Sequence, residues 1–275
     1  MPELPEVETI VREIAPQLEG AKIAHAELRK TDVLREVIKP RLIKTLQGNT
    51  IEQVYRRAKH IVFRLKSGHR MIIQPRMTGS VIVYERKLTR DELKYAVLIC
   101  TLSNKRQFVY RDVRRLGTIW LLDEEGWIAY TGRIGPEPLE ETFTPLVFSD
   151  RLKGTRTAVK KAIMDQRRLA GVGNIYANEA LFDARINPAK ATSKLSGAEF
   201  DRLHGAIVDV LQRALASAGT TLRDYRRGTG EPGNFQFELR VYGRGGEKCV
   251  SCRRTLIETQ EIDKRTTTYC KKCQR

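Results

Sequence analysis

The sequence has few of the features that mark membrane and secreted proteins. No apolar run approaches the roughly 18 residues of a membrane-spanning helix, and the first twenty residues carry five glutamates, which argues against a secretory signal or transit peptide. Cysteine is scarce, with five in 275 residues, and four of these lie between positions 249 and 273. This crowding is typical of a metal site rather than a disulfide framework, and it fits a reducing compartment. We therefore expect a cytoplasmic protein without a membrane segment.

Acidic residues are in deficit relative to basic ones. The chain has 33 Asp and Glu against 50 Lys and Arg, a formal net charge of +17. With 41% hydrophobic and 30% charged residues, it has the composition of a folded globular protein. The positive surplus favours a polyanionic partner, above all nucleic acid.

The apolar pattern predicts an α+β protein with two dissimilar halves. Residues 4–18 place their apolar side chains on one face of a helix. From about 22 to 130, short apolar stretches alternate with Gly, Asn and charged turns, which predicts an N-terminal β-sandwich or barrel. Beyond that region the periodicity is helical, with helices predicted over 157–168, 175–184 and 198–218.

Turn-forming residues set the expected domain boundaries. Gly and Pro cluster just after residue 131, which predicts an interdomain linker, and residues 228–233 predict a mobile loop. The expected segments are a β-sandwich domain over 1–132, a linker over 133–150, a helical domain over 151–240 and a cysteine-bearing β segment over 241–275.

The cysteine cluster predicts a structural metal site. Cys249 and Cys252 form one C-x-x-C pair, and Cys270 and Cys273 form a second after seventeen residues. Each pair can aim two thiolates at one tetrahedral ion, and the intervening length suits a β-hairpin. We expect one structural Zn²⁺ in a four-cysteine zinc ribbon; two unrelated reduced pairs are the alternative.

A glycine-rich turn separates two predicted helices. Gly171 and Gly173 permit positive φ and leave backbone N–H groups bare, and the next helix begins at about Asn174. A helix N-terminus in this position accepts a phosphate, and Lys160 is among the basic residues nearby. A plain interhelical connection remains the alternative.

The amino terminus permits two interpretations. Pro2, Glu3 and Glu6 suit the first turn of a helix, where proline loses no hydrogen bond and negative charge meets the helix dipole. Removal of the initiator methionine would instead leave Pro2 as a free secondary amine with a pKa of about 8. Such an amine can attack a sugar C1′ to form an iminium, while the carboxylates manage protons.

Several motifs occur in one order along the whole chain, and together they resemble the formamidopyrimidine-DNA glycosylase family. The motifs are Pro2-Glu-Leu-Pro-Glu-Val-Glu-Thr9, Arg56-Arg-Ala-Lys59, Met77-Thr-Gly79, Asp112-Val-Arg-Arg-Leu-Gly117, Asp165-Gln166, Gly171-Val-Gly-Asn-Ile-Tyr176, Gly219-Thr-Thr-Leu-Arg-Asp224, Val241-Tyr-Gly-Arg244 and Cys273-Gln274.

This resemblance implies a bifunctional DNA glycosylase and AP lyase that acts on duplex DNA containing oxidised purines such as 8-oxoguanine and formamidopyrimidines, and that functions as a monomer. It implies a catalytic first domain and a helix–two-turn–helix domain with a lesion-capping loop. The implied catalytic residues are the nucleophile Pro2, the general acid Glu3, its neighbour Glu6, the general acid and phosphate contact Lys59, and Arg265, which assists δ-elimination. The implied DNA-binding residues are Met77, Arg114, Leu116, Lys160, Asn174, Arg223 and Tyr242.

The sequence departs from the family pattern in three places. Gln74-Pro-Arg76 replaces a histidine-bearing segment, Leu116 replaces a phenylalanine, and Leu93-Lys-Tyr-Ala96 replaces a histidine-rich strand. None of these changes falls on an implied catalytic residue. We therefore expect the chemistry to be kept while lesion search and opposite-base preference shift. The alternatives are an endonuclease VIII-like glycosylase for oxidised pyrimidines and a non-catalytic zinc-ribbon DNA-binding protein.

Overall fold

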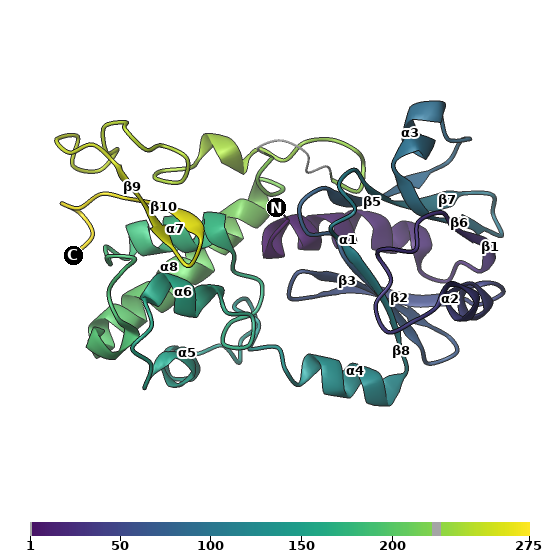
Figure 1. The fold of residues 1–275 in the computed structure, drawn as a ribbon, viewed down its shortest axis with the longest axis horizontal. Helices are drawn as coiled ribbons and strands as arrows, with labels where there is room; N and C mark the ends of the chain where they lie inside the picture. Colours follow the sequence, from purple (N-terminus) through teal and green to yellow (C-terminus); the bar gives the residue numbers. More distant parts are fainter. Residues whose placement is uncertain (1, 222–226) are drawn as a thin grey trace. The chain divides into compact units, whose positions relative to one another are not determined.

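The computed structural model describes residues 2–221 and 227–275. The chain divides into two compact units (Figure 1). Unit 1 comprises Met1–Gly132 and Ser217–Asn234, and unit 2 comprises Arg133–Ala216 and Phe235–Arg275. The expected boundary at 132 coincides with this division. Residues 217–234, which we expected in the helical domain, group instead with unit 1.

Unit 1 is built on two four-stranded antiparallel sheets, ordered β1-β6-β7-β5 and β2-β3-β4-β8. The strands are β1 (Ile23–Leu28), β2 (Ile51–Arg57), β3 (His60–Leu65), β4 (Arg70–Gln74), β5 (Gly79–Tyr84), β6 (Ala96–Leu102), β7 (Gln107–Asp112) and β8 (Thr118–Leu122). One apolar core joins both sheets, since Phe63 of β3 stacks on Phe108 of β7 with ring centroids 5.2 Å apart. The β-sandwich prediction is confirmed.

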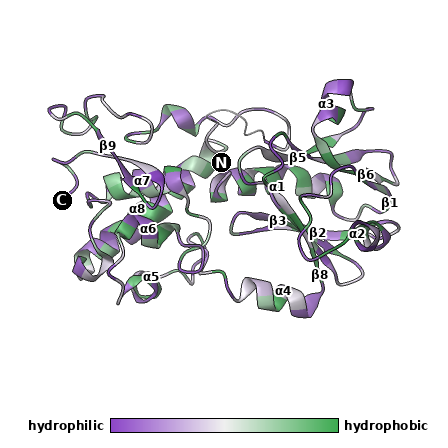
Figure 2. Cartoon of the chain, in the orientation of Figure 1, coloured by the Kyte–Doolittle hydropathy of each residue, from purple (hydrophilic) through white to green (hydrophobic). Residues whose placement is uncertain are grey.

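Helix α1 (Leu4–Leu18) has the bounds that its apolar spacing predicts. Its residues Ile10, Ile14 and Leu18 are fully buried in the core of unit 1. Hydrophobic and hydrophilic residues share the surface of this helix (Figure 2), so burial of one face stabilises it. A capping box between Glu3 and Glu6 starts the helix.

Three short helices of unit 1 escaped the sequence analysis. They are α2 (Lys39–Leu46), α3 (Arg90–Lys94) and α4 (Glu124–Thr131). Helices α3 and α4 have no buried residue, so no buried apolar face marks them in the sequence, and α3 is mostly hydrophilic (Figure 2). Side-chain caps begin both helices, from Thr89 to the amide of Glu92 and from Asp123 to the amide of Gly126.

Unit 2 is mainly helical and carries one β-hairpin. Its elements are α5 (Pro145–Leu152), α6 (Val159–Met164), α7 (Asn174–Asp183), η1 (Thr192–Lys194), α8 (Gly197–Ala216), η2 (Phe235–Phe237), β9 (Glu258–Ile262) and β10 (Arg265–Tyr269). Helix α7 is buried over most of its length, and α8 packs against both α7 and α5. No helix within 2–221 and 227–275 is long and apolar enough to cross a membrane.

The stretch expected to be a linker over 133–150 contributes two aromatic side chains to the core of unit 2. Phe143 and Phe148 are buried, and Phe143 stacks on His204 of α8 with ring centroids 4.8 Å apart. Thr144 caps the amide of Val147, and the proline that suggested a chain break lies in the first helical turn. Proline is favoured there because its missing N–H has no intrahelical partner in any case.

Candidate active site and DNA-binding elements

The first turn of α1 places two buried carboxyl groups beside Pro2, which is itself buried. Glu3 and Glu6 each expose 1% of their surface. Glu6 Oε2 accepts a hydrogen bond of 2.7 Å from the backbone N–H of Glu3, and Oε1 accepts one of 2.7 Å from the N–H of Thr220. Both oxygens of Glu6 are therefore held by main-chain donors. The structure brings the three predicted N-terminal residues together.

Residues 217–221 pack closely against Glu6, and a glycine makes this close approach possible. Gly219 has φ +81°, and a Cβ there would lie 2.9 Å from Glu6 Oε1. A Cβ on Gly233 would lie 2.3 Å from the carbonyl oxygen of Gly219. Side chains at either position would displace the segment that donates to Glu6. Sequence reasoning quoted the Gly219 motif but missed the contact with Glu6, which joins positions more than 200 residues apart.

Lys59 lies in the tight turn between β2 and β3 and exposes only 9% of its surface. The preceding Ala58 has φ +52°. Arg56 fixes one side of this turn by donating to Glu8 of α1 at 2.8 Å and to the carbonyl of Ala58 at 3.1 Å. His60 fixes the other side through the carbonyl of Arg57 at 3.0 Å. Arg56 thus acts as a brace between α1 and the turn rather than as a solvated strand end.

Three of the predicted DNA-binding residues, named the wedge residues below, lie on two adjacent loops: Met77, Arg114 and Leu116. Strand β4 pairs with β8 through Gln74 and Thr118, and β5 pairs with β7 through Gly79 and Asp112. The turn between β4 and β5 therefore emerges beside the loop between β7 and β8. Met77 and Leu116 are exposed by 41% and 39%, so neither side chain belongs to the core of unit 1. Arg114 Nη1 lies 3.5 Å from the sulfur of Met77.

In unit 2, Gln166 shapes the glycine turn before α7. Its Oε1 accepts from the N–H of Gly171 at 2.9 Å, and its Nε2 donates to the carbonyl of Val172 at 2.9 Å. Asn174 begins α7 after this turn, as predicted, and its side chain donates to the carbonyl of Thr266 at 3.1 Å. Asn174 therefore stands at a helix N-terminus, where backbone N–H groups are available to an anion.

Lys160 does not lie where the sequence analysis expected it. We predicted a DNA contact, but this lysine is completely buried. Its Nζ donates to the carbonyl of Thr266 at 3.0 Å and to Thr267 Oγ1 at 2.7 Å. The ammonium group is therefore held by strand β10. Because helix periodicity does not distinguish a buried lysine from an exposed one, only the tertiary contact reveals this role.

The segment around Tyr242 is held by a buried glutamate. Glu179 of α7 accepts hydrogen bonds from the N–H groups of Arg240, Val241 and Tyr242 at 2.9, 3.0 and 2.7 Å. Burial raises the pKa of Glu179, although these donors oppose the shift. Tyr242 is half-buried, and sequence reasoning missed its anchor. Arg223, the remaining predicted contact, lies outside the described residues.

The hairpin β9–β10 presents Arg265 to solvent. Asp263 and Lys264 form its two-residue turn with φ values of +54° and +57°, the left-handed pair that matches the twist of a hairpin. Three side chains of α6 and α7 hold β10 on these helices. They are Lys160, Asn174 and Asn178, and Asn178 accepts a hydrogen bond from the N–H of Thr268 at 2.9 Å. Arg265 is therefore the first residue of a strand that is anchored to α6 and α7, the helices on either side of the glycine turn.

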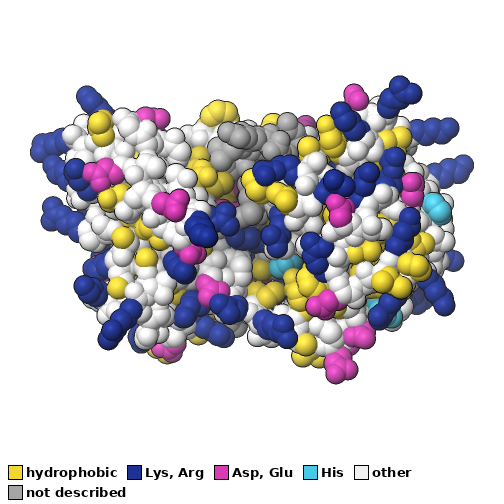
Figure 3. Space-filling view, in the orientation of Figure 1, with side chains coloured by type: hydrophobic (Ala, Val, Ile, Leu, Met, Phe, Trp, Pro, Cys, Tyr) yellow, Lys and Arg dark blue, Asp and Glu magenta, His cyan; other side chains and the backbone are white. Residues whose placement is uncertain are grey.

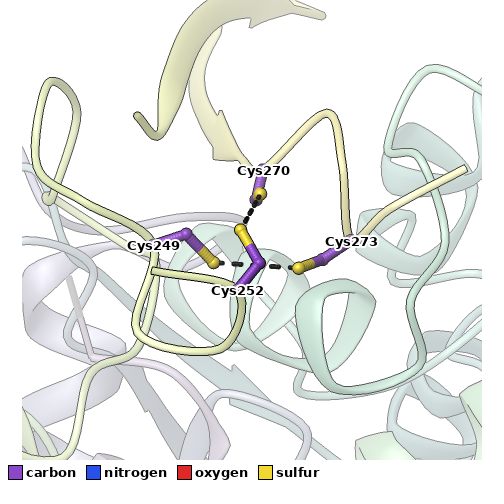
Figure 4. A group of neighbouring side chains, drawn as sticks. All are labelled: Cys249, Cys252, Cys270 and Cys273. Carbon is purple, nitrogen blue, oxygen red and sulfur yellow. Dashed lines mark hydrogen bonds between the residues drawn. The ribbon is translucent and has the colours of Figure 1, made fainter. Parts of the chain in front are cut away.

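The four predicted metal ligands converge at the ends of the hairpin (Figure 4). Their sulfur atoms all lie within 4.8 Å of one another, and the pairs Cys249–Cys273 and Cys252–Cys270 are 3.8 Å apart. A Zn–S bond of about 2.3 Å places the sulfurs of a tetrahedral site about 3.8 Å apart, whereas a disulfide needs about 2.05 Å. The geometry therefore fits one metal ion and no disulfide.

The thiols of this cluster differ in acidity. Backbone N–H donation, first from Arg254, lowers the pKa of Cys252 to about 6, while burial raises the pKa of Cys273 to about 12. Four neighbouring thiolates repel one another, and a bound cation removes that repulsion. Lys and Arg side chains are scattered over the visible face of each unit (Figure 3), in keeping with the net charge of +17.

Comparison with known proteins identifies the family. Residues 1–119 match the formamidopyrimidine-DNA glycosylase N-terminal domain, and residues 134–226 match the formamidopyrimidine-DNA glycosylase H2TH domain. The chain is 40% identical to the formamidopyrimidine-DNA glycosylase of Thermomicrobium roseum, covering 100% of this chain and 99% of the relative. It is also 40% identical to that of Edwardsiella ictaluri over the full length of both. The chain belongs to the formamidopyrimidine-DNA glycosylase family.

Solved structures of family members agree in fold. A Lactococcus lactis enzyme variant in complex with Fapy-dG-containing DNA superposes with a TM-score of 0.92 at 34% identity, covering 100% of both chains. A complex of the L. lactis enzyme with abasic-site DNA gives a TM-score of 0.91 at 33% identity and covers 99% of both chains. The predicted fold class and family are thus confirmed, and this formamidopyrimidine-DNA glycosylase family member is a DNA-repair enzyme.

Proposed function

We propose that the protein removes oxidised purines, including 8-oxoguanine and formamidopyrimidines, from duplex DNA and then nicks the strand, with Pro2 as the nucleophile. The observation that carries this proposal is the buried carboxyl pair next to Pro2, with both oxygens of Glu6 held by backbone N–H groups. Burying two carboxyl groups costs folding free energy. Buried titratable groups of this kind are typical of functional sites. The L. lactis complexes with Fapy-dG and abasic DNA support the substrate class.

The chemistry begins at the secondary amine of Pro2, once the initiator methionine has been removed. Its lone pair attacks the sugar C1′, the bond from C1′ to the base breaks, and the base leaves with a proton. The attached nitrogen loses its proton, Glu3 protonates the sugar ring oxygen, and the bond from C1′ to that oxygen breaks as nitrogen and C1′ form an iminium. Removal of a C2′ proton then expels the 3′ phosphate, and a second elimination expels the 5′ phosphate. Lys59 and Arg265 bind the phosphates involved.

Base flipping requires a replacement for the extruded base. Met77 and Leu116 provide exposed apolar side chains on adjacent loops, and Arg114 beside them can hydrogen-bond the orphaned partner base. Leucine cannot stack as an aromatic ring does. We therefore expect Leu116→Phe to change the ratio of excision rates for lesions paired with C and with A; identical ratios for parent and variant would contradict this assignment.

The cysteine cluster would hold one structural Zn²⁺. All four ligand positions are filled by protein sulfur, so no open position remains for substrate chemistry. The ion would fix both ends of the hairpin that carries Arg265. Phosphate contacts from this hairpin, from Asn174 and from Lys59 would make affinity fall steeply with salt, as expected of an enzyme that acts on chromosomal DNA in the cytoplasm.

Reductive trapping tests the function directly. Borohydride should reduce the iminium and leave a covalent adduct between the protein and 8-oxoguanine duplex, with peptide mapping placing the nucleotide on Pro2. Pro2→Gly should weaken the adduct, and an uncleaved N-terminal extension should abolish it. Intact mass of the untreated protein reports whether Met1 is removed.

The same assay separates the alternatives. Preferential trapping on oxidised pyrimidines would favour the endonuclease VIII-like alternative. Failure to trap on any oxidised base by a protein with a free Pro2 would leave the zinc-ribbon DNA-binding alternative. An adduct mapped to any other residue would refute the proposed nucleophile.

A further inference from the structure

We propose that Asp112 is a positioning residue that holds the two wedge loops in one prearranged geometry and so sets how fast a lesion is captured. The wedge loops are residues 75–78 and 113–117, between β4 and β5 and between β7 and β8. The inference rests on the proposed function, because it assigns a cause to the efficiency of base flipping.

Asp112 ends strand β7 and exposes 1% of its surface. Its Oδ1 accepts a hydrogen bond from Thr78 Oγ1 in one wedge loop. Its Oδ2 accepts from the N–H of Gly117 in the other wedge loop at 2.8 Å, and from the hydroxyl of Tyr110 at 3.2 Å. One buried carboxylate therefore binds both loops at once. An ionised carboxylate only accepts hydrogen bonds, and its two oxygens have room for all three donors.

The hydrogen-bond chain reaches the residues that would enter DNA. Thr78 Oγ1 accepts from the N–H of Arg114 at 3.0 Å while it donates to Asp112. Thr78 follows Met77 directly, and Gly117 follows Leu116 directly. Each of the three wedge side chains thus lies on, or next to, a residue fixed through this carboxylate.

Close packing leaves the network little freedom. A Cβ on Gly117 would lie 1.9 Å from the hydroxyl of Tyr110 and 2.7 Å from the carbonyl of Gln74. A Cβ on Gly79 would lie 2.4 Å from the carbonyl of Pro75. A glycine that no larger residue could replace without a clash therefore stands at the C-terminal end of each loop.

The fold does not by itself require this network at the loop tips. The ladders β4–β8 and β5–β7 and the shared core hold the strands, whereas Met77 and Leu116 expose apolar surface. Loops that had to become ordered on entering DNA would lose conformational entropy at each residue. Fixing them beforehand removes that cost from the binding step. Asp112 therefore acts on capture of the lesion and not on bond breaking.

The test compares Asp112→Asn with the matched control Asp123→Asn, in which the lost carboxylate caps α4 of the same unit. An amide keeps the volume but introduces two N–H donors opposite existing donors. Two readouts are measured in the full-length protein: 2-aminopurine fluorescence opposite an 8-oxoguanine for wedge insertion, and single-turnover excision from the same duplex. A third, borohydride trapping on single-stranded abasic DNA, needs no base flipping.

We expect Asp112→Asn to slow insertion and duplex excision by about tenfold or more, from the loss of hydrogen bonds to a charged group, while trapping on single strands stays within about twofold. Asp123→Asn should match the parent in all three. Thr78→Val, which removes only the link between the loops, should reproduce the slower insertion and serves if Asp112→Asn does not fold. Unchanged insertion in a folded variant, or an equal fall in single-strand trapping, would overturn the proposal. Failure of the parent itself to trap would count against the proposed function, while the fluorescence readout would still decide the role of Asp112.

Discussion

Replacing Lys160 with methionine removes the ammonium group that ties α6 to strand β10 and nearly preserves the side-chain volume. If the buried lysine braces the hairpin, the variant should open the hairpin more often. If it contacted phosphate, as the sequence alone suggested, the variant should instead lose one electrostatic contact with DNA. The two roles therefore predict different measurements.

The size of the effect follows from the two hydrogen bonds to Thr266 and Thr267. A hydrogen bond to a charged group contributes about 1.5–3 kcal/mol. The carbonyl of Thr266 keeps its bond from Asn174, and the hydroxyl of Thr267 keeps its bond to the carbonyl of Arg265, so neither group is left alone. We expect a net loss of about 2–4 kcal/mol, which raises the open population of the hairpin about 30- to 1,000-fold.

Hydrogen exchange of the β10 amides in the zinc-loaded protein measures this opening. The control is Lys161→Met, because Lys161 is half exposed and pairs with Asp263 at 2.7 Å in a surface ion pair. Such pairs contribute less than about 1 kcal/mol, so protection in the control should barely change. Unchanged protection in Lys160→Met, together with a salt-dependence slope lowered by about 1, would refute the bracing role.

Three further predictions concern the carboxyl pair, the metal and α3. Gly219→Ala should lower the yield of trapped adduct well below that of Gly230→Ala. Both glycines have positive φ, but of the two only Gly219 lies against Glu6. Equal yields would contradict the claim that close packing of Gly219 against Glu6 is needed for the chemistry. Stripping the metal with a thiol-reactive mercurial should release one Zn²⁺ per chain and weaken duplex binding, measured by a zinc-sensitive dye and by anisotropy; binding that survived complete release would show that the ion is dispensable. Hydrogen bonding from Arg86 lowers the pKa of Glu92 to about 2 from the ordinary 4.5, so the capping of α3 should persist above about pH 4.5 and be lost as the pH falls through about 2, measured by NMR titration; a midpoint near 4.5 would exclude the ion pair.

Local chemistry made much of the molecule predictable. Helix α1 was predictable because one buried face repeats with helical spacing, and its bounds are those expected. The cysteine cluster was predictable because short C-x-x-C turns impose their geometry regardless of the fold, and the four sulfurs do converge. The motif order likewise indicated the family that the comparisons establish.

Tertiary contacts decided what the local pattern left open. Residues 145–150 fell within the expected linker because proline is common both in chain breaks and in first helical turns, whereas the structure places them in α5 with Phe148 buried in the core. Lys160 resembled a phosphate ligand because charge is visible in a sequence and burial is not. The hydrogen bonds from Thr220 to Glu6 and from Gly117 to Asp112 depend on how the loops close. The sequence by itself therefore determined the chemical groups and their local turns, whereas only the tertiary structure decided which charges are buried and what they hold, because burial is a property of distant residues packed together.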